Sequence, residues 1–271
     1  MPTARSLTSP RAPFALARRA LLAAALAVVC ALAAGAPDAA LAAAPAPPPA
    51  ASAPDAEPVA EPAPPTPQLA WTAQIEQAVV ARAAPDPRAR AVRHLLPWAR
   101  WWGGAEVLLV LGARVVDGER WLDVLVKGMP AGSHGWIPAH AATLRRTGRR
   151  IVVDLSARTL AFQRAGRTTL RTRVVVGARA TPTPTGQFAV DAAVAMPRSA
   201  RLGPRVLAVV AYSPTLTVYE GGLPQTAIHA AEQLGDPLGS AASNGCVRIP
   251  QRTLDALLRR APRGTPVVIQ P

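Results

Sequence analysis

The hydrophobic positions of this chain change their pattern twice along its length. Residues 20–35 form an uninterrupted apolar run, and residues 36–68 are dominated by Ala and Pro. From residue 69 onward, short stretches rich in Val, Ile, Leu and Trp are separated by Gly, Pro and Asp. Short apolar stretches bounded by turn residues are typical of strands. The pattern therefore predicts a mainly β protein behind a long N-terminal segment that has no core of its own.

The N-terminal segment has the features of an export signal. No acidic residue occurs before the apolar run, whereas four arginines do: Arg5, Arg11, Arg18 and Arg19. The run of 16 residues is short for a full membrane span, and an A-x-A cleavage site ends at Ala42. We interpret residues 1–42 as a signal peptide, with an uncleaved signal anchor as the alternative. In both cases the rest of the protein is expected in the periplasm or cell wall, with membrane contact only through an uncleaved signal.

Residues 43–68 are predicted to be a disordered linker. They combine Ala and Pro with a few acids and contain no aromatic residue. Such a composition cannot bury enough apolar surface to offset the entropy cost of folding, and its prolines favour an extended chain.

The charge of the chain is strongly positive. It has 30 Lys and Arg against 16 Asp and Glu, a net charge of +14. Nucleic acid is the usual partner of so basic a protein. The export signal and the scatter of the arginines argue against it, so we expect no nucleic-acid binding. Anionic cell-wall polymers are the expected electrostatic partners.

The pattern between residues 69 and 148 predicts a small β module. Four β-prone stretches are separated by turn residues, at 79–85, 107–116, 120–126 and 135–144. Asp117-Gly118 between two of them predicts a hairpin. The closing sequence WLDVLV…GSHGWIPAHAATL resembles bacterial SH3-like domains, which implies a small SH3-like barrel.

All six tryptophans lie in this module. Trp98, Trp101 and Trp102 form a cluster that is either a ligand-stacking face or part of the packing. The histidines of the module are unevenly spaced and have no cysteine or paired carboxylates beside them, so no metal site is expected.

Residues 149–271 are predicted to form a second, β-dominated domain with one short C-terminal helix. Seven stretches favour strands: 150–156, 158–163, 170–178, 187–190, 205–212, 215–219 and 267–269. Residues 250–261 favour a helix, because Pro250 stands near its start and its leucines recur at helical spacing.

The candidate chemistry of this domain centres on one cysteine. Of the two cysteines, Cys30 lies in the apolar run, so an exported mature protein keeps only Cys246. An unpaired thiol outside the cytoplasm is expected to pair between chains or to react, and the alternative is a buried structural cysteine. His229 is the only histidine of the domain, with sixteen residues between it and Cys246. A nearby His can take the thiol proton and form a thiolate–imidazolium pair.

Three motifs in this order are similar to the YkuD-type L,D-transpeptidase domain. They are IVVDLSARTLAF, then VVVGARATPTPTGQFAV, then IHA followed by SNGCVRI. The resemblance covers nearly all of residues 150–271. It implies an exported enzyme that acts on peptidoglycan stem peptides through a thioester acyl-enzyme and forms 3→3 cross-links or related amide bonds. It implies no cofactor and no metal.

The resemblance also implies roles for individual residues. Cys246 would be the nucleophile and His229 the general base, while the backbone carbonyl of Ala230 would hold the other ring nitrogen of His229. The backbone N–H groups of Gly245 and Cys246 would bind the oxyanion.

Three further residues are candidates for substrate binding: Arg248, Asn244 and Ser243. Arg248 could grip a stem-peptide carboxylate with its planar donors, and its alternative role is a structural salt bridge. Many family members have His where this chain has Asn244 and Gly where it has Ala230, so a second His cannot be an obligatory base here. Glu232 and Asp236 are expected to be loop residues without a catalytic role.

Two other functions remain open from the sequence. One is a different exported thiol acyl-transferase or hydrolase, of the sortase or carboxypeptidase kind. The other is a non-catalytic wall-binding protein in which both domains only adhere.

Overall fold

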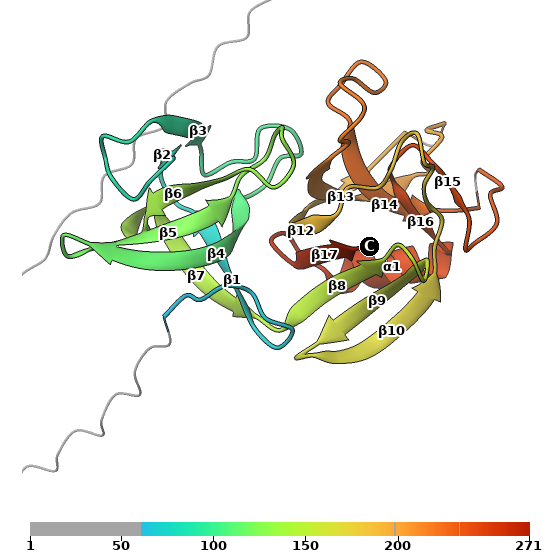
Figure 1. Ribbon diagram of the computed structural model, residues 1–271, viewed down its shortest axis with the longest axis horizontal. Coiled ribbons are helices and arrows are strands. Elements are labelled where there is room, and N and C mark those ends of the chain that lie inside the picture. Colours follow the sequence, from blue (N-terminus) through green and yellow to red (C-terminus); the bar gives the residue numbers. More distant parts are fainter. Residues whose placement is uncertain (1–60, 198, 233) are drawn as a thin grey trace, which may run out of the picture. The chain divides into compact units, whose positions relative to one another are not determined.

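The computed structural model describes residues 61–197, 199–232 and 234–271. The predicted signal segment and most of the predicted linker lie outside these residues. The described residues fold into two large sheets, a two-stranded sheet and one α-helix (Figure 1). The sequence-based prediction of a mainly β protein with one short C-terminal helix is therefore confirmed for the described chain.

The first large sheet has seven strands, all antiparallel to their neighbours. Its strands are β1 (Ala70–Ile75), β2 (Val79–Arg82), β3 (Ala91–Leu95), β4 (Val107–Val116), β5 (Glu119–Leu125), β6 (His134–Pro138) and β7 (Ala142–Thr147). They lie in the order β3-β2-β6-β5-β4-β1-β7. Between β4 and β5, Asp117 has φ 50° and Gly118 has φ 79°. Positive φ at both central residues matches the twist of a hairpin, so the predicted Asp-Gly turn is confirmed.

The first sheet also differs from its prediction. Strands β1 and β3 were not expected, and the predicted stretch 135–144 is divided into β6 and β7 by a 3-10 turn at Ala139–Ala141 that follows Pro138. The buried side chains of the sheet form a core of their own around Leu108, Leu122 and Ile137. The assignment of this sheet to the SH3-like class stays a prediction.

The second large sheet has eight strands. They are β8 (Arg149–Asp154), β9 (Thr159–Arg164), β10 (Arg167–Arg173), β12 (Gly186–Ala195), β13 (Arg205–Tyr212), β14 (Gln225–Ala230), β16 (Val247–Ile249) and β17 (Pro266–Gln270). The order is β10-β9-β8-β17-β12-β13-β14-β16, and the pairs β8–β17 and β14–β16 are parallel. The short strands β11 (Val176–Gly177) and β15 (Ala241–Ser243) pair separately and in parallel.

The predicted strand at 215–219 is wrong. Residues 213–224 form an irregular excursion between β13 and β14, in which Tyr219 and Gly222 exchange two backbone hydrogen bonds across a tight turn. The turn residues Glu220 and Gly221 have φ 46° and 79°. The alternating polarity of this stretch therefore reflects a turn rather than a strand in the sheet.

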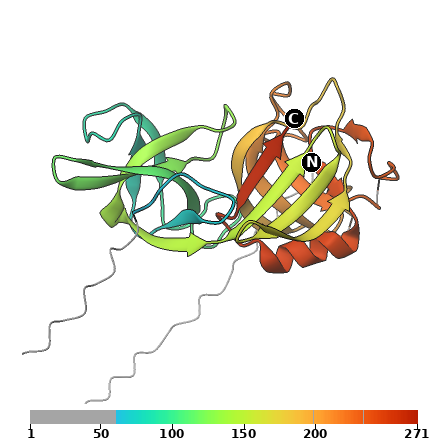
Figure 2. The ribbon, with the colours of Figure 1, turned by 60° about the horizontal axis from the view of Figure 1, so that its bottom comes forward.

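The helix α1 (Gln251–Arg260) packs along the second sheet (Figure 2). Its apolar stripe places Leu254 and Leu257 in the core with no exposed surface. Pro250 stands at the N-cap, where its missing N–H costs nothing, and two arginines occupy the last turn, where the helix dipole favours positive charge. The predicted helix is confirmed to within one residue at each end.

A third apolar cluster contains residues of both large sheets. Ala70, Leu109 and Leu125 pack there with Ala189 and Val210, and all five are buried. The predicted domain boundary at residues 148–149 falls at the short connection between β7 and β8. Because the cluster draws on both sheets, point variants are better suited than truncations for separating their roles.

One glycine lets the loop 181–185 approach β11. A Cβ on Gly177 would collide with the backbone of Thr181 and Thr183, and the Gly177 N–H donates to Thr183 Oγ1 at 2.8 Å. We predict that Gly177→Ala lowers the free energy of unfolding by about 1–3 kcal/mol, as overpacking against backbone does. Gly112→Ala is the matched control, because its Cβ would meet no atom within 4 Å. Urea unfolding of both variants checks this, and equal effects would contradict the packing argument.

Candidate active site

Cys246 lies at the start of β16, directly after a tight turn that follows β15. The turn depends on Gly245, whose φ of 103° is strained for any residue with a Cβ. A Cβ there would also lie 3.4 Å from the Pro182 carbonyl oxygen. Glycine thus lets the cysteine loop lie against the Thr-Pro loop of residues 181–185 and fixes where the chain enters β16.

His229 reaches the same site from β14. Because β14 and β16 pair in parallel, Ile228 lies opposite Val247 and His229 lies opposite Arg248. The His229 side chain is therefore brought to the entrance of β16, where Cys246 lies, although sixteen residues separate the two in sequence. Both side chains line one cavity.

A backbone carbonyl fixes the tautomer of His229. Its Nδ1 lies 2.9 Å from the carbonyl oxygen of Ala230, and a carbonyl can only accept a hydrogen bond. Nδ1 therefore carries the proton in neutral His229, and the lone pair is on Nε2. This leaves Nε2 as the nitrogen that can take a proton from another group.

Burial keeps both groups neutral at rest. The His229 side chain is only 1% exposed, and burial, assisted by the Arg248 charge, lowers its pKa from 6.5 to about 4, against the opposing hydrogen bond to Ala230. Burial also raises the pKa of the partly exposed Cys246 thiol, although a backbone hydrogen bond from Ala227 and the Arg248 charge oppose it. The resting pair is thus a neutral thiol and a neutral imidazole, not the thiolate–imidazolium pair considered from the sequence.

Ser243 organises the cysteine loop from inside. Its Oγ donates to the Cys246 carbonyl oxygen at 2.6 Å and accepts from the Gly245 N–H at 3.1 Å. Its own carbonyl oxygen accepts from Thr181 Oγ1 and from the Ala178 N–H. Ser243 is fully buried and does not line the cavity, so the structure places it behind the site rather than in a substrate-binding position. The Gly245 N–H is already engaged, and it would have to leave Ser243 to bind an oxyanion.

Arg248 pairs with Asp236, which the sequence suggested to be a loop residue without a role. Its Nη1 contacts the Asp236 carboxylate, and its buried Nε has no hydrogen-bond partner among the described residues. The Arg248 side chain is about one-tenth exposed. The structure thus shows the salt bridge named as the alternative role, while the unpaired Nε leaves one donor for a ligand. Asn244 is exposed and lines the cavity.

The cavity itself is small. Its volume is about 40 Å³, well below the roughly 300–1,000 Å³ of ligand pockets in general. Besides the predicted residues, four others line it: Arg201, Leu202, Tyr219 and Leu234. They belong to the irregular segments after β12, β13 and β14, where sequence pattern gives no signal for a site. A cavity of this size is too small to enclose a peptide, although Cys246 is itself partly exposed.

Two further properties concern the described residues alone. No group of three or more His, Cys, Asp and Glu side chains among them is arranged to hold a metal ion. Their one helix is too short and too polar to cross a membrane.

The comparison with protein families decides the assignment of this domain. Residues 148–269 match the model of the YkuD family, the L,D-transpeptidase catalytic domain. This region is an L,D-transpeptidase catalytic domain.

Solved structures of L,D-transpeptidases are also similar to the chain. The catalytic domain of the E. faecium L,D-transpeptidase is 22% identical, with a TM-score of 0.34, over 45% of this chain and 96% of that one. An L,D-transpeptidase from Mycobacterium smegmatis is 17% identical, with a TM-score of 0.36, over 74% of this chain and 99% of that one. No curated protein matches the chain. The L,D-transpeptidase assignment rests on the family match, not on these low-scoring similarities.

The lowered pKa of His229 implies that the free energy of unfolding depends on pH. Between its ordinary pKa of 6.5 and about 4, the unfolded chain binds a proton at this position that the folded protein does not. Stability is therefore lost as the pH falls through this window, by about 2 kcal/mol from pH 7 to pH 5. Urea unfolding at several pH values should show a smaller loss for His229→Gln. The control His140→Gln, at an exposed side chain, should behave as the wild type. Equal losses in all three proteins would show that His229 is not held neutral by the fold.

Proposed function

We propose that the protein is an exported, cysteine-dependent L,D-transpeptidase that acts on peptidoglycan stem peptides. Cys246 would form a thioester with the donor stem and pass it to an amine of another stem, which yields a 3→3 cross-link. The observation that carries this proposal is the His229 geometry: Nδ1 is held by Ala230, and the side chain lines one cavity with Cys246 in an L,D-transpeptidase catalytic domain.

The first half-reaction begins from the neutral pair. As Cys246 Sγ attacks the carbonyl carbon of the donor, its proton passes to His229 Nε2. The resulting imidazolium gives that proton to the leaving amine, the C–N bond breaks, and the acyl group stays on Sγ as a thioester. Because the pKa of His229 is about 4, the imidazolium is a strong acid and returns its proton readily.

The second half-reaction reverses the proton transfers. The acceptor amine attacks the thioester carbon and loses a proton to His229, which then returns it to Sγ as the C–S bond breaks. Water in place of the amine would give hydrolysis by the same steps. A cavity of only about 40 Å³ beside Cys246 limits the water near the thioester, which would favour the amine.

An oxyanion forms once in each half-reaction and needs hydrogen-bond donors. The Cys246 N–H is the donor that remains of the predicted pair, because the Gly245 N–H donates to Ser243 Oγ. The amide side chain of Asn244 lines the cavity and supplies a further donor. We propose that Asn244 and Cys246 bind the oxyanion and that Gly245 joins them only if its bond to Ser243 opens.

We propose two roles for Arg248, a salt bridge to Asp236 and a contact with the substrate, which its different nitrogen atoms can perform at the same time. Its guanidinium holds Asp236, and its unpaired Nε–H can donate to a stem-peptide carboxylate. Its positive charge also opposes the rise that burial causes in the pKa of the Cys246 thiol.

The rest of the chain would place this domain at the wall. Residues 1–42 would direct export and residues 43–68 would act as a spacer. The module of residues 69–148, with its proposed SH3-like fold, would position the catalytic domain, and the net positive charge would favour anionic wall polymers.

Acylation tests the nucleophile directly. We predict that imipenem, a carbapenem, adds once to the full-length protein, because the strained lactam can replace the donor amide. Intact-protein mass spectrometry should show one adduct in the wild type and in Cys30→Ala, and none in Cys246→Ala. An unmodified wild type would contradict the proposed thioester chemistry.

The rates of acylation separate His229 from Asn244. His229→Ala should slow acylation by about 10²- to 10⁴-fold, the usual effect of losing a general base. Asn244→Ala removes only a hydrogen bond and should cost roughly 5- to 150-fold.

Stopped-flow measurements between pH 4 and 9 add a second criterion. The wild type and Asn244→Ala should lose rate only as the pH falls toward 4, where His229 becomes protonated, and should stay level near neutral pH. His229→Ala should instead keep gaining rate above neutral pH, because only the ionised thiol then reacts. A His229→Ala profile with the wild-type shape would remove His229 from the mechanism.

A further inference from the structure

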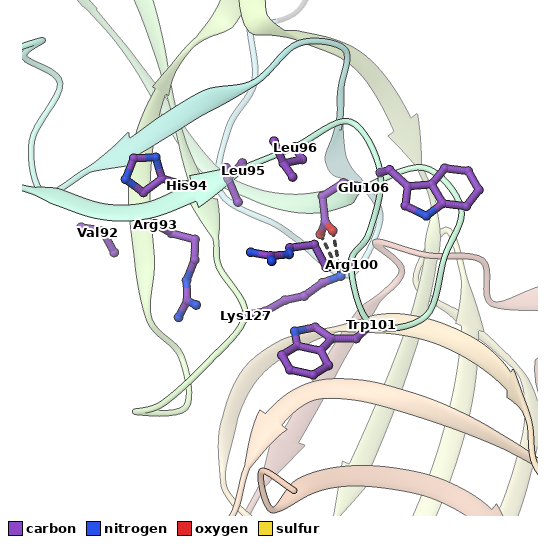
Figure 3. Close-up of a pocket in the computed structure, with 10 residues that line it drawn as sticks. Val92, Arg93, His94, Leu95, Leu96, Arg100, Trp101, Glu106 and Lys127 are labelled. Carbon is purple, nitrogen blue, oxygen red and sulfur yellow. Dashed lines mark hydrogen bonds and ion pairs between the residues drawn. The ribbon is translucent and has the colours of Figure 1, made fainter. Parts of the chain in front are cut away.

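A second cavity lies in the first sheet, away from the cysteine. It has a volume of about 620 Å³, within the range of ligand pockets. Its walls come from β3, from the loop that joins β3 to β4, and from Lys127 just after β5 (Figure 3). None of the proposed catalytic residues lines it. The transpeptidase chemistry therefore leaves this pocket unexplained.

The loop between β3 and β4 exposes three tryptophans, of which Trp98 and Trp101 line the pocket and Trp102 does not. Trp98 is 64% exposed and Trp101 is 78% exposed, although both line the pocket. The loop is nevertheless well anchored, because Ala99 between them is fully buried and exchanges backbone hydrogen bonds with Gly103 and Gly104. The Glu106 N–H closes the loop at the Pro97 carbonyl. Packing the indoles of Trp98 and Trp101 inward would stabilise the fold through burial, and the exposed loop lacks this stabilisation.

The charges around the pocket are unbalanced. Arg93 and Arg100 line it, and no salt bridge or side-chain hydrogen bond joins either to another described residue. The carboxylate of Glu106, the one acid in the lining, is taken by Lys127 at 2.8 Å. In Figure 3 the Arg100 guanidinium extends toward the side on which Arg93 lies, while Glu106 and Lys127 contact one another beside it. Two guanidinium groups thus share a pocket that supplies no free anion.

We propose that this pocket binds a saccharide that carries a carboxylate. The flat C–H faces of a sugar ring can lie against the exposed indoles of Trp98 and Trp101, which present large rigid surfaces. A carboxylate on the same ligand fits the planar forks of Arg93 and Arg100, which lack an acidic partner. An apolar ligand would leave the two arginines unpaired, and a simple anion would leave the two tryptophans exposed.

Two sources can supply this chemistry in a cell wall. One is a glycan strand that carries the carboxylates of stem peptides, and the other is a polysaccharide with acidic sugars. A disaccharide tetrapeptide represents the first, and a hyaluronan tetrasaccharide, whose glucuronates are β-linked, represents the second. The methyl ester of the hyaluronan tetrasaccharide has the same rings without the charge, and the free tetrapeptide has the carboxylate without a sugar.

Isothermal titration of the full-length protein tests the proposal. We expect at least one of the two charged saccharides to bind, and the methyl ester or the free tetrapeptide to bind roughly tenfold more weakly than the corresponding charged saccharide. Trp101→Ala and Arg100→Ala should each weaken binding by about tenfold. Trp102→Ala and Arg88→Ala are matched controls outside the lining, and their affinities should stay within about twofold of the wild type. The urea unfolding midpoint should be unchanged in all four variants, which shows that they remain folded without relying on the transpeptidase proposal.

Several outcomes would overturn the site. Absence of binding by both charged saccharides would do so, and so would equal losses in the pocket variants and their controls, which indicate only a general attraction to a basic surface. Equal binding of the methyl ester would remove the carboxylate from the proposal, and equal binding of the free tetrapeptide would remove the sugar. Which charged saccharide binds more tightly distinguishes the glycan strand from an acidic polysaccharide.

Discussion

The parallel pairing of β14 with β16 is the constraint on which the rest of the catalytic site depends. It sets His229 opposite Arg248 and leaves Cys246 at the entrance of β16. A parallel pair cannot be closed by a tight hairpin, so a long connection must join the two strands. Here that connection contains β15, which pairs with β11 and brings the cysteine loop against residues 181–185. The same backbone pairing therefore fixes Cys246 as the proposed nucleophile, His229 as the proposed base and the loop that supports them.

Burial then determines how these groups react. A histidine as buried as His229 resists protonation, and burial makes the Cys246 thiol resist ionisation. In the proposed mechanism the proton therefore stays on sulfur until a substrate carbonyl arrives, and proton transfer and bond formation occur close together. Arg248 moderates this state, because its charge favours the thiolate and disfavours the imidazolium. Asp236 balances that charge and holds the guanidinium in place.

Local sequence signals predicted much of this fold. Strands β4 and β13 and helix α1 follow from strong apolar patterns bounded by Pro, Gly or Asp, and the Asp117-Gly118 hairpin follows from turn chemistry. Strand β1 was missed because its sequence AWTAQI mixes polar and apolar residues, although pairing on both sides buries most of it. In the site, Cys246 and His229 could be found from their rarity and the family motif. Asp236 and Tyr219 could not be found in this way. Asp236 pairs with Arg248, and Tyr219 lines the cavity with Cys246, only because irregular segments fold back onto the sheet, and the hydrophobic pattern of the sequence does not predict such segments.

A protonated thiol beside a small cavity also affects how long the proposed enzyme would stay active. Oxidants and alkylating agents react with thiolates far more readily than with thiols, and each step of cysteine oxidation beyond the sulfenic acid is hard to reverse. The proposed export would place Cys246 away from the glutathione pool that repairs cysteines in the cytoplasm. In the proposed mechanism the sulfur ionises only when substrate is present, beside a cavity of about 40 Å³, so little thiolate is exposed between turnovers. The working lifetime of the catalyst is then set by the fold itself.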